Sequence, residues 1–469
     1  MAIEADSREV GSTDPRFKSA VRGAVLGFFV DMFDLYLPIV VLAPALIYFV
    51  SPEIDETTKT IIGAFIFATA LIGRPVGALI FGGLADSIGR RRTTIISISG
   101  FGAVTLLLAL MPGYQYIGIA APIIFIILRF VDGVFIGGEY SAANPLAMEY
   151  SPREKRGYYG GMIIAAFPFA YACISVITMI LLFIMPSEGI NSPYVQWGWR
   201  IPFVIGAALS FAFVLYYVRY VSESELWEGV KRDAEARGDT SSPLRRLFQG
   251  ENLKDFLQVF VLMSGLWFII NPVFAILPGL LSSEVGLSST NATIALVIMS
   301  LVMTGAYWAA GAISQRTGRR TFFMFMAVFA AVGATSIYYV LLSTTPQNLF
   351  VVTLMIIGIA ILSAPVWGVG PTYVNERFHT GVRASAYGLG YSLAVIIPSF
   401  YALYQAGLAQ FMPSQYTVLV LLVIGSILIF VGAAWGPETK DVDFSQDLKA
   451  FPEQEKSPVG GDVDTQGVT

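Results

Sequence analysis

The sequence is poor in the residues that most metal and redox sites need. It has one cysteine, Cys173, and one histidine, His379, among 469 residues. A single cysteine excludes a disulfide within the chain, and no Cys/His cluster with metal-ligand spacing is present. A Gly-x-x-x-x-Gly-Lys-Ser/Thr phosphate-binding loop is also missing, which excludes that mode of ATP use. We therefore expect no metal, no cofactor and no enzymatic activity.

Charged residues are scarce as well. Asp, Glu, Lys and Arg make up 13% of the chain, whereas apolar residues make up 55%. This charged share is about half the usual value for a soluble protein. The apolar residues fall in long blocks, while soluble helices and strands show amphipathic or alternating patterns. Composition and pattern together indicate a chain that lies in lipid.

A helix needs about 20 apolar residues to cross about 30 Å of hydrocarbon. Twelve blocks of the sequence meet this requirement. We expect all of them to be helical, because isolated strands leave backbone polar groups unsatisfied in lipid. The predicted spans are 21–49, 60–84, 93–111, 119–146, 157–183, 200–220, 255–281, 292–314, 321–342, 348–373, 384–408 and 415–435.

The positive residues fall almost wholly in alternate connections between these spans. Lys and Arg cluster at 90–92, 153–156, 231–254, 316–320 and 377–383. The positive-inside rule places these connections and both termini in the cytoplasm. The first 20 residues are polar and predict no cleaved signal peptide. We therefore expect a multi-pass protein of the plasma (cell inner) membrane.

The spans fall into two groups of six, separated by a long polar segment. Two motifs repeat across this segment at nearly the same offset. Residues 82–91 after the second span match 311–320 after the eighth, and a Glu-to-Arg spacing of seven recurs after the fourth and tenth spans. Such repetition predicts a six-helix unit used twice, with a site between the halves. The predicted organisation is a cytoplasmic N-terminal segment at 1–20, six-helix bundles at 21–221 and 255–435, a cytoplasmic linker at 222–254 and a disordered cytoplasmic tail at 436–469.

Several sequence strings carry a family resemblance along nearly the whole chain. They are the Gly-x-x-x-Asp-x-x-Gly-Arg-Arg turn at 82–91, Pro437-Glu438-Thr439-Lys440, Arg74-Pro75-Val76-Gly77-Ala78, Gly137-Gly138-Glu139-Tyr140 and Trp197-Gly198-Trp199-Arg200. The first two resemble signatures of the major facilitator superfamily. The others are similar to strings of its metabolite:proton symporters, which carry oxoglutarate, citrate, shikimate, proline or betaine. The resemblance implies an all-α membrane protein with twelve transmembrane helices in two six-helix bundles.

The sequence departs from this pattern at three places, one of which is Asp132, where many relatives are expected to have an uncharged residue. The second copy of the turn has Gln315 where the first has Asp86, so one half alone can form that charged latch. The Asp31-Met32-Phe33-Asp34 run instead resembles the aromatic-acid and sialate-type proton symporters. The subfamily therefore stays open.

Charged residues inside spans are costly and usually functional or paired. Here they gather in the first half. The acids are Asp31, Asp34, Asp132 and Glu139, and the arginines are Arg74 and Arg129. Asp31 and Asp34 share one helical face, and Arg129, Asp132 and Glu139 share another. If all six meet, two carboxylates lack a cationic partner, and burial with like-charge repulsion favours proton uptake. We predict that one or more of the acids binds the driving proton; the alternative is permanent ion pairs that join spans 1, 2 and 4.

Arginine can offer a two-pronged hydrogen-bond donor to a carboxylate. Arg74 and Arg129 are therefore candidate ligands of an anionic substrate. The alternative is that each neutralises an acid; we favour this structural role for Arg74 and leave both open for Arg129. In the second half, the candidates for substrate contact are Trp267, Asn271, Trp367 and Tyr391, with helix packing as the alternative. Prolines near them free backbone carbonyls, which spans tolerate where they line a cavity.

A third set of residues lies at the expected cytoplasmic ends. The predicted gating residues are Gly82, Asp86, Gly89, Arg90, Arg91, Glu149, Arg156, Glu376 and Arg383. The resemblance implies that Asp86 belongs to a latch, and we expect Glu149 with Arg156 and Glu376 with Arg383 to be partners at the rim. Charges that pair in one state and separate in another bias a two-state equilibrium.

Together these features predict proton-coupled uptake of a small organic anion, most simply a carboxylate, by alternating access. The alternatives are a proton-coupled antiporter that exports drugs or metabolites, uptake of a zwitterionic solute or sugar, and a receptor with a transporter fold. The expected partners are the substrate, protons and the lipid bilayer, with no nucleic acid, and we expect the chain to function as a monomer.

Overall fold

The computed structural model describes residues 15–51, 53–221, 247–248, 250–346, 348–378 and 380–444. It is all-helical over this part of the chain, with twelve segments long and apolar enough to cross a membrane. The predicted number of spans and their helical character are therefore confirmed. Their order along the chain also matches the twelve apolar blocks of the sequence.

The first six spans form the N-terminal half. The fifth is divided into two helices, and a short helix, α4, lies in the connection that precedes the fourth. The helices are α1 (Pro15–Val41), α2 (Glu56–Ile88), α3 (Arg90–Ala109), α4 (Tyr114–Ile117), α5 (Ala120–Tyr150), α6 (Arg156–Ile164), α7 (Ala166–Ile184) and α8 (Arg200–Tyr220).

The last six spans form the C-terminal half, and four of them change helix type or break partway. Their α-helices are α11 (Gly250–Ile270), α12 (Leu277–Ser283), α13 (Ser289–Thr317), α14 (Arg319–Val328), α15 (Thr335–Thr344), α16 (Leu349–Ser363), α17 (Gly370–Arg377), α18 (Thr380–Leu393), α19 (Ile396–Ser399), α20 (Tyr401–Leu408) and α21 (Thr417–Trp435).

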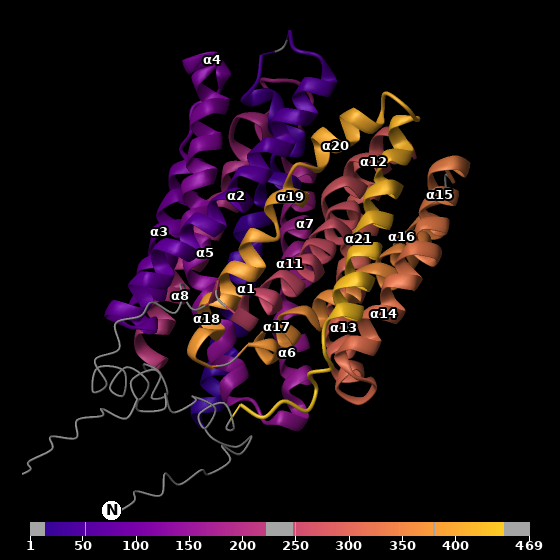
Figure 1. Cartoon of the computed structure of the whole chain (residues 1–469). Helices are drawn as coiled ribbons and strands as arrows, with labels where there is room; N and C mark the ends of the chain where they lie inside the picture. The colour runs from indigo at the N-terminus through magenta and orange to yellow at the C-terminus, as the bar shows by residue number, and fades with distance from the viewer. Residues whose placement is uncertain are drawn as a thin grey trace, which may run out of the picture.

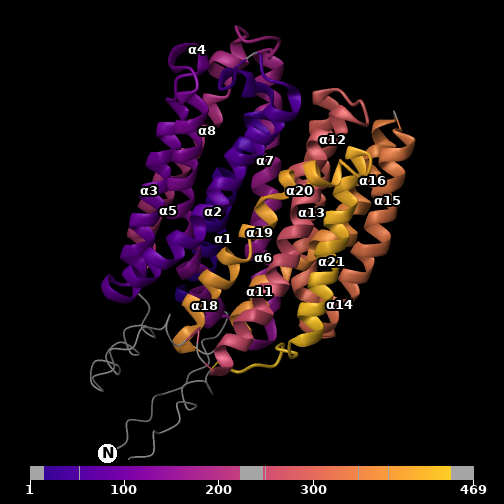
Figure 2. The ribbon, with the colours of Figure 1, turned by 45° about the horizontal axis from the view of Figure 1, so that its top comes forward.

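The two halves stand side by side, with α6, α7, α11 and α13 between them (Figures 1 and 2). The indigo-to-purple helices α2, α3 and α5 lie on one side, and the orange and yellow helices α14, α15, α16 and α21 on the other, while the orange-yellow helix α18 reaches across to α2 and α5. Both ends of the described chain lie at the same end of the bundle, which is the lower end in Figure 1. We call this the basal end, and the end that carries α4 the far end.

Prolines lie at two of the interruptions that the apolar pattern did not predict. The first span, expected to reach residue 49, leaves the α-helix at Val41 and continues as a 3₁₀ helix, η1 (Ala43–Tyr48), that has a proline in its first turn. In the seventh span, α11 and α12 are joined by a π-helical stretch, η4 (Asn271–Ile276), that begins at Pro272. Proline lacks an N–H and its ring clashes with the preceding turn, so regular α-helix cannot continue through it unchanged.

Glycine allows α2 and α5 to cross at backbone contact. A Cβ atom at Gly77 or Gly133 would overlap the carbonyl oxygen of Val134 or Ala70 on the opposite helix. Small residues let helix backbones approach closely within a membrane, where packing contacts drive association. This close crossing matters for the site, because α2 and α5 carry the two arginines of the membrane interior.

The polar segments at the boundaries need two corrections. The second bundle begins with α11 at Gly250, five residues before the predicted boundary, and the linker residues 222–246 lie outside the described residues. The tail was expected to be disordered from 436. Residues 436–444 instead pack against the basal end, because Glu438 and Thr439 form hydrogen bonds to the helices there. Residues 445–469 lie outside the described part.

Candidate functional site

The first element of the candidate site is an ion pair between α1 and α2. The Oδ1 atom of Asp31 lies 2.5 Å from Nη2 of Arg74, and both side chains are fully buried. The other carboxylate oxygen of Asp31, Oδ2, has no hydrogen-bond partner among the described residues. Removing one member of a buried pair leaves an uncompensated charge and is strongly destabilising. The pair therefore ties the two helices together, yet half of the carboxylate stays available.

The second element is a three-helix network around Arg129 of α5. Its Nη1 atom donates to Oδ2 of Asp132 at 2.6 Å and to Oδ2 of Asp34 at 3.2 Å. Its Nη2 atom donates to the backbone carbonyl of Leu35 at 3.2 Å. Thr105 of α3 adds a hydroxyl that donates to Oδ1 of Asp34 at 2.5 Å. Both Nη atoms of Arg129 thus donate to acceptors, and all of these acceptors belong to the N-terminal half.

Glu139 is the fourth acid of this region. It is 2% exposed, lies nearer the basal end of α5, and contacts α1 so closely that a Cβ at Gly27 would lie 2.5 Å from its Oε1. It interacts electrostatically with Asp31 and Arg74, but forms no ion pair within 4 Å with any described residue. The six residues Asp31, Asp34, Arg74, Arg129, Asp132 and Glu139 are called the acid–arginine cluster. It holds four carboxyl groups and two guanidinium groups.

An aromatic wall from the C-terminal half faces this cluster. The rings of Trp267, Trp367 and Tyr391 meet edge to face, with centroids 4.8, 5.3 and 5.7 Å apart. They come from three different spans, through α11, η6 (Ala364–Gly368) and α18. The guanidinium of Arg74 lies 5.9 Å from the centroid of the Tyr391 ring, within the range of a cation–π contact. Arg74 therefore lies at the interface between the halves, and Arg129 is held inside one half.

The polar atoms of this wall are mostly satisfied by the backbone. The indole N–H groups donate to the carbonyls of Tyr391 and Leu266, at 3.2 and 3.0 Å. The amide nitrogen of Asn271 donates to the carbonyl of Pro398, within the short helix α19, at 2.9 Å. Its Oδ1 atom has no partner among the described residues. The indoles therefore offer ring surface, and Asn271 keeps one acceptor.

Sequence reasoning missed a group of buried tyrosines at the same level. Tyr36 of α1 stacks on Phe167 and meets the edge of Tyr171. Tyr307 of α13 is fully buried, and its hydroxyl has no hydrogen-bond partner among the described residues. Tyr36, Tyr307 and Tyr391 are close enough to interact electrostatically. Tyr36 follows the Asp31–Asp34 run, which is a usable signal, but nothing in the sequence distinguishes Tyr307 from a packing residue.

At the basal end the predicted rim residues form crossed pairs. The expectation was that Glu149 pairs with Arg156 and Glu376 with Arg383. Glu149 instead lies 3.3 Å from Nη1 of Arg383, and Glu376 lies 3.8 Å from Nη1 of Arg156. Each acid therefore meets the arginine of the other half, because each arginine lies in the first turn of the helix that follows its own acid and points across the interface. The two crossed pairs hold the halves together at this end.

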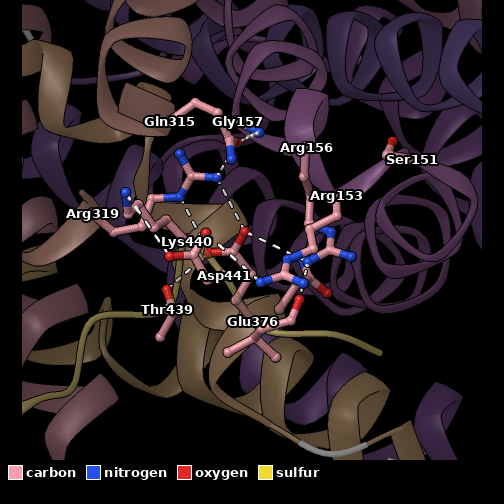
Figure 3. Close-up of polar contacts among 12 residues, drawn as sticks. Ser151, Arg153, Arg156, Gly157, Gln315, Arg319, Glu376, Thr439, Lys440 and Asp441 are labelled. Carbon is pink, nitrogen blue, oxygen red and sulfur yellow. Dashed lines mark hydrogen bonds and ion pairs between the residues drawn. The ribbon is translucent and has the colours of Figure 1, made fainter. Parts of the chain in front are cut away.

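Arg319 is a further basal residue that the sequence analysis assigned to topology alone. Figure 3 shows it beside Glu376, to which it donates through two nitrogens at 3.1 and 3.2 Å. It also donates to Ser314 and Gln315, and Gln315 accepts from the backbone N–H of Gly157 in the other half at 2.9 Å. The internal repeat could have indicated this role, since Arg319 occupies the position of Arg90.

The remaining predicted gating residues either lie outside the described residues or make contacts within one half. The side chains of Asp86 and Arg90 lie outside the described residues, as does His379. Arg91 donates to the backbone carbonyls of Val218 and Val221, at 2.5 and 2.7 Å, and so joins α3 to α8 within one half. Gly89 precedes α3 with a φ of 101°, a conformation that glycine adopts at little cost. Gly82 has open space around its Cα.

Comparison with known proteins matches the family model of the major facilitator superfamily over residues 24–402. The chain belongs to this superfamily. It is similar to an inner membrane metabolite transport protein of Escherichia coli, YhjE, with 27% identity over 82% of this chain and 86% of the relative. A proline/betaine transporter and an alpha-ketoglutarate permease of the same organism are 26% and 27% identical, covering 88% and 84% of this chain and 83% and 87% of the relatives.

Solved structures agree with the fold. The proton:xylose symporter XylE of Escherichia coli has a TM-score of 0.71 at 18% identity, with 92% of this chain and 98% of that chain covered. A human organic anion transporter has a TM-score of 0.66 at 14% identity, with 89% and 100% covered. The facilitator is therefore a multi-pass membrane transporter of metabolites with the two-bundle fold that the sequence predicts.

Proposed function

We propose that this facilitator takes up a small organic anion, most simply a carboxylate, together with protons. The observation that carries the proposal is the acid–arginine cluster, in which four buried carboxyl groups face two guanidinium groups. Uncompensated charge inside a membrane protein is costly. The surplus of two carboxylates is removed when protons bind, and a protonated cluster then holds a positive group for an anion.

The Asp31–Arg74 pair supplies a way to couple the two ligands. A proton on Asp31 weakens its pairing with Arg74, and the guanidinium becomes available to a carboxylate of the substrate. Conversely, a substrate that engages Arg74 competes with Asp31 and favours protonation of that acid. The two ligands thus strengthen each other's binding, as linkage requires. This reasoning assigns substrate contact to Arg74 and leaves Arg129 as the residue that holds Asp34 and Asp132.

The C-terminal half supplies the second surface of the proposed site. Trp267, Trp367 and Tyr391 offer ring faces and edges, and the buried Tyr307 hydroxyl offers a donor that has no acceptor among the described residues. A site that contacts both halves is what alternating access needs, because rocking of the halves then exposes it to one side at a time. The crossed pairs at the basal end belong to the state that is closed there. The positive-inside pattern of the sequence supports a cytoplasmic basal end.

The test uses the purified chain in liposomes with an imposed inward proton gradient. The panel contains mono-, di- and tricarboxylates, a betaine, proline and a sugar. We expect accumulation of one carboxylate that a protonophore abolishes. Equilibration without accumulation, or efflux driven by the inward gradient, would contradict the symport proposal while leaving the fold unaffected.

The Asp31→Asn variant tests the coupling step. An asparagine at this position resembles the protonated acid, so Arg74 stays available to the anion at every pH. We therefore expect loss of gradient-driven accumulation, with exchange of labelled for unlabelled substrate retained and independent of pH. Glu53→Gln, at an exposed acid, is the matched control and should behave as wild type. Normal accumulation by Asp31→Asn would exclude Asp31 as the coupling acid.

A zwitterionic substrate is the second candidate, because aromatic faces beside buried carboxylates suit a quaternary ammonium group. The names of two relatives, a proline/betaine transporter and a glycine betaine/proline/ectoine/pipecolic acid transporter, are consistent with this alternative. In that case Arg74 would hold the carboxylate and the wall of Trp267, Trp367 and Tyr391 the cationic end. Accumulation of the betaine rather than any carboxylate in the liposome panel would select it.

A further inference from the structure

Residues 436–444 follow α21 and cross the basal end, and we call them the strap. The strap is first fastened to its own half. The carboxylate of Glu438 accepts from the backbone N–H groups of Arg319 and Arg320, at 2.8 and 3.1 Å, where α14 begins. The Thr439 hydroxyl donates to Oε2 of Glu376 at 2.8 Å. Figure 3 shows Thr439, Lys440 and Asp441 beside this group.

The strap then reaches the N-terminal half. Nη1 of Arg156, at the start of α6, donates to the backbone carbonyl of Val442 at 2.9 Å. Arg153 lies 3.8 Å from Asp441, but both side chains are exposed and such a pair contributes little. The Arg156 bond is different, because that side chain is 4% exposed. The strap is therefore held between the halves rather than lying against one of them.

Phe444 ends the described chain between two guanidinium groups. The Cζ atom of Arg156 lies 3.6 Å from the ring centroid, and that of Arg383 lies 3.7 Å from it. One arginine comes from each half, and each also has its carboxylate partner in the crossed pairs, Glu376 and Glu149. A guanidinium can bond through its edge while its face stacks on a ring. The two arginines thus form a slot that fits an aromatic side chain.

We propose that Arg156 and Arg383 form an aromatic-binding site between the halves, and that Phe444 of the strap occupies it and stabilises the state closed at the basal end. This goes beyond substrate coupling, since neither substrate nor proton takes part. It rests only on the rocking of the halves that the proposed function includes. When the basal ends separate, Arg156 moves away from Arg383, and the ring can keep at most one of its two contacts.

The physical consequence is a shift between the two states rather than a loss of folding. Each cation–π contact with a desolvated guanidinium contributes free energy that the open state gives up in part. A variant without the ring therefore populates the basal-open state more. We expect a change of about fivefold in the ratio of the two states, since a contact of about 1 kcal/mol corresponds to that factor.

The experiment measures distances between spin labels across the basal end. The chain has one cysteine, so Cys173→Ser provides a background for labels at Arg92→Cys and Thr321→Cys, at the exposed starts of α3 and α14. Electron–electron double resonance then reports the two populations. Phe444→Leu keeps an apolar side chain of similar size without the ring, and Phe444→Trp keeps an aromatic face. We expect the longer-distance population to rise in the first and to stay at the wild-type level in the second.

Val442→Ala is the matched control in the strap. It shortens a partly exposed side chain and keeps the carbonyl that Arg156 uses, so its distances should match wild type. Thermal stability and elution in detergent are compared for all variants, and Phe444→Ala serves as a second ring-deleted variant. Wild-type distances in both Phe444→Leu and Phe444→Ala would overturn the proposal. An equal shift in Val442→Ala would also overturn the proposal, because the effect would then not be specific to the ring of Phe444. Failure to find a transported substrate would leave this readout unaffected.

Discussion

Gly161 is the point where a single methyl group should move the halves apart. It lies on α6 of the N-terminal half and faces the backbone of α13 in the other half. A Cβ atom built at this position meets the Tyr307 carbonyl oxygen at 2.9 Å, the Gly311 Cα at 3.0 Å and the Trp308 carbonyl oxygen at 3.1 Å. All three are backbone atoms, so no side-chain rotation can relieve the contacts.

The magnitude follows from those distances. Ordinary van der Waals contact of a Cβ begins at 3.4 Å, so Gly161→Ala requires α6 and α13 to separate by a few tenths of an ångström. Overpacking of this kind costs about 1–3 kcal/mol. The cost is confined to the state in which the basal ends touch, so it biases the equilibrium toward the basal-open state by about 5- to 150-fold.

The assay is the same label pair, Arg92→Cys with Thr321→Cys, in the Cys173→Ser background. Gly161→Ala should shift the distribution to longer distances with little change in thermal stability. Gly305→Ala is the control, because Gly305 lies on the exposed face of α13 with open space around its Cα. Unchanged distances with a marked loss of thermal stability in Gly161→Ala would refute the reasoning, since the α6–α13 crossing would then be the same in both states.

Two further predictions concern the buried hydroxyl and the strap. Tyr307→Phe should leave thermal stability unchanged, because the hydroxyl has no hydrogen-bond partner in the described part of the chain. It should weaken apparent substrate affinity by about fivefold, measured as half-saturation of uptake. Unchanged affinity would remove Tyr307 from the site. Glu438→Gln should lower the free energy of unfolding by about 0.3–1 kcal/mol, since an exposed carboxylate at the start of α14 loses its charge, and thermal unfolding in detergent measures this. Both partners lie in one half, so the label distances should stay as in wild type, and a shift there would contradict the assignment.

The spans and their grouping could be predicted because they depend on local composition. Each span is a block of apolar residues long enough to cross the bilayer, and no long-range information is needed to find it. The helix breaks at Pro272 and near Pro365 were harder to predict from the sequence. A proline marks a possible interruption, but whether the helix kinks, tightens or continues depends on the neighbours that satisfy its free carbonyls.

For the site, helix periodicity predicted which charges share a face. Arg129 and Asp132 are three apart, were expected to share a face, and form an ion pair on α5. Periodicity could not predict that Arg74 meets Asp31 while Arg129 meets Asp34, because this depends on how α1, α2 and α5 cross. Nor could it predict the crossed rim pairs. Glu149 and Arg156 are close in sequence, and only the tertiary arrangement directs each toward the other half.

The replacement of Asp86 by Gln315 in the second copy of the turn has a physical reason in the basal network. Gln315 accepts one hydrogen bond from Arg319 and one from the backbone N–H of Gly157, through the same oxygen. Arg319 already has the charge of Glu376, and Glu438 lies at the start of the same helix. An aspartate at 315 would add a third carboxylate to this group, in which Arg319 and Glu376 are buried. The neutral amide keeps the bond between the halves without that charge, so the second copy departs from the signature while its position still joins the two bundles.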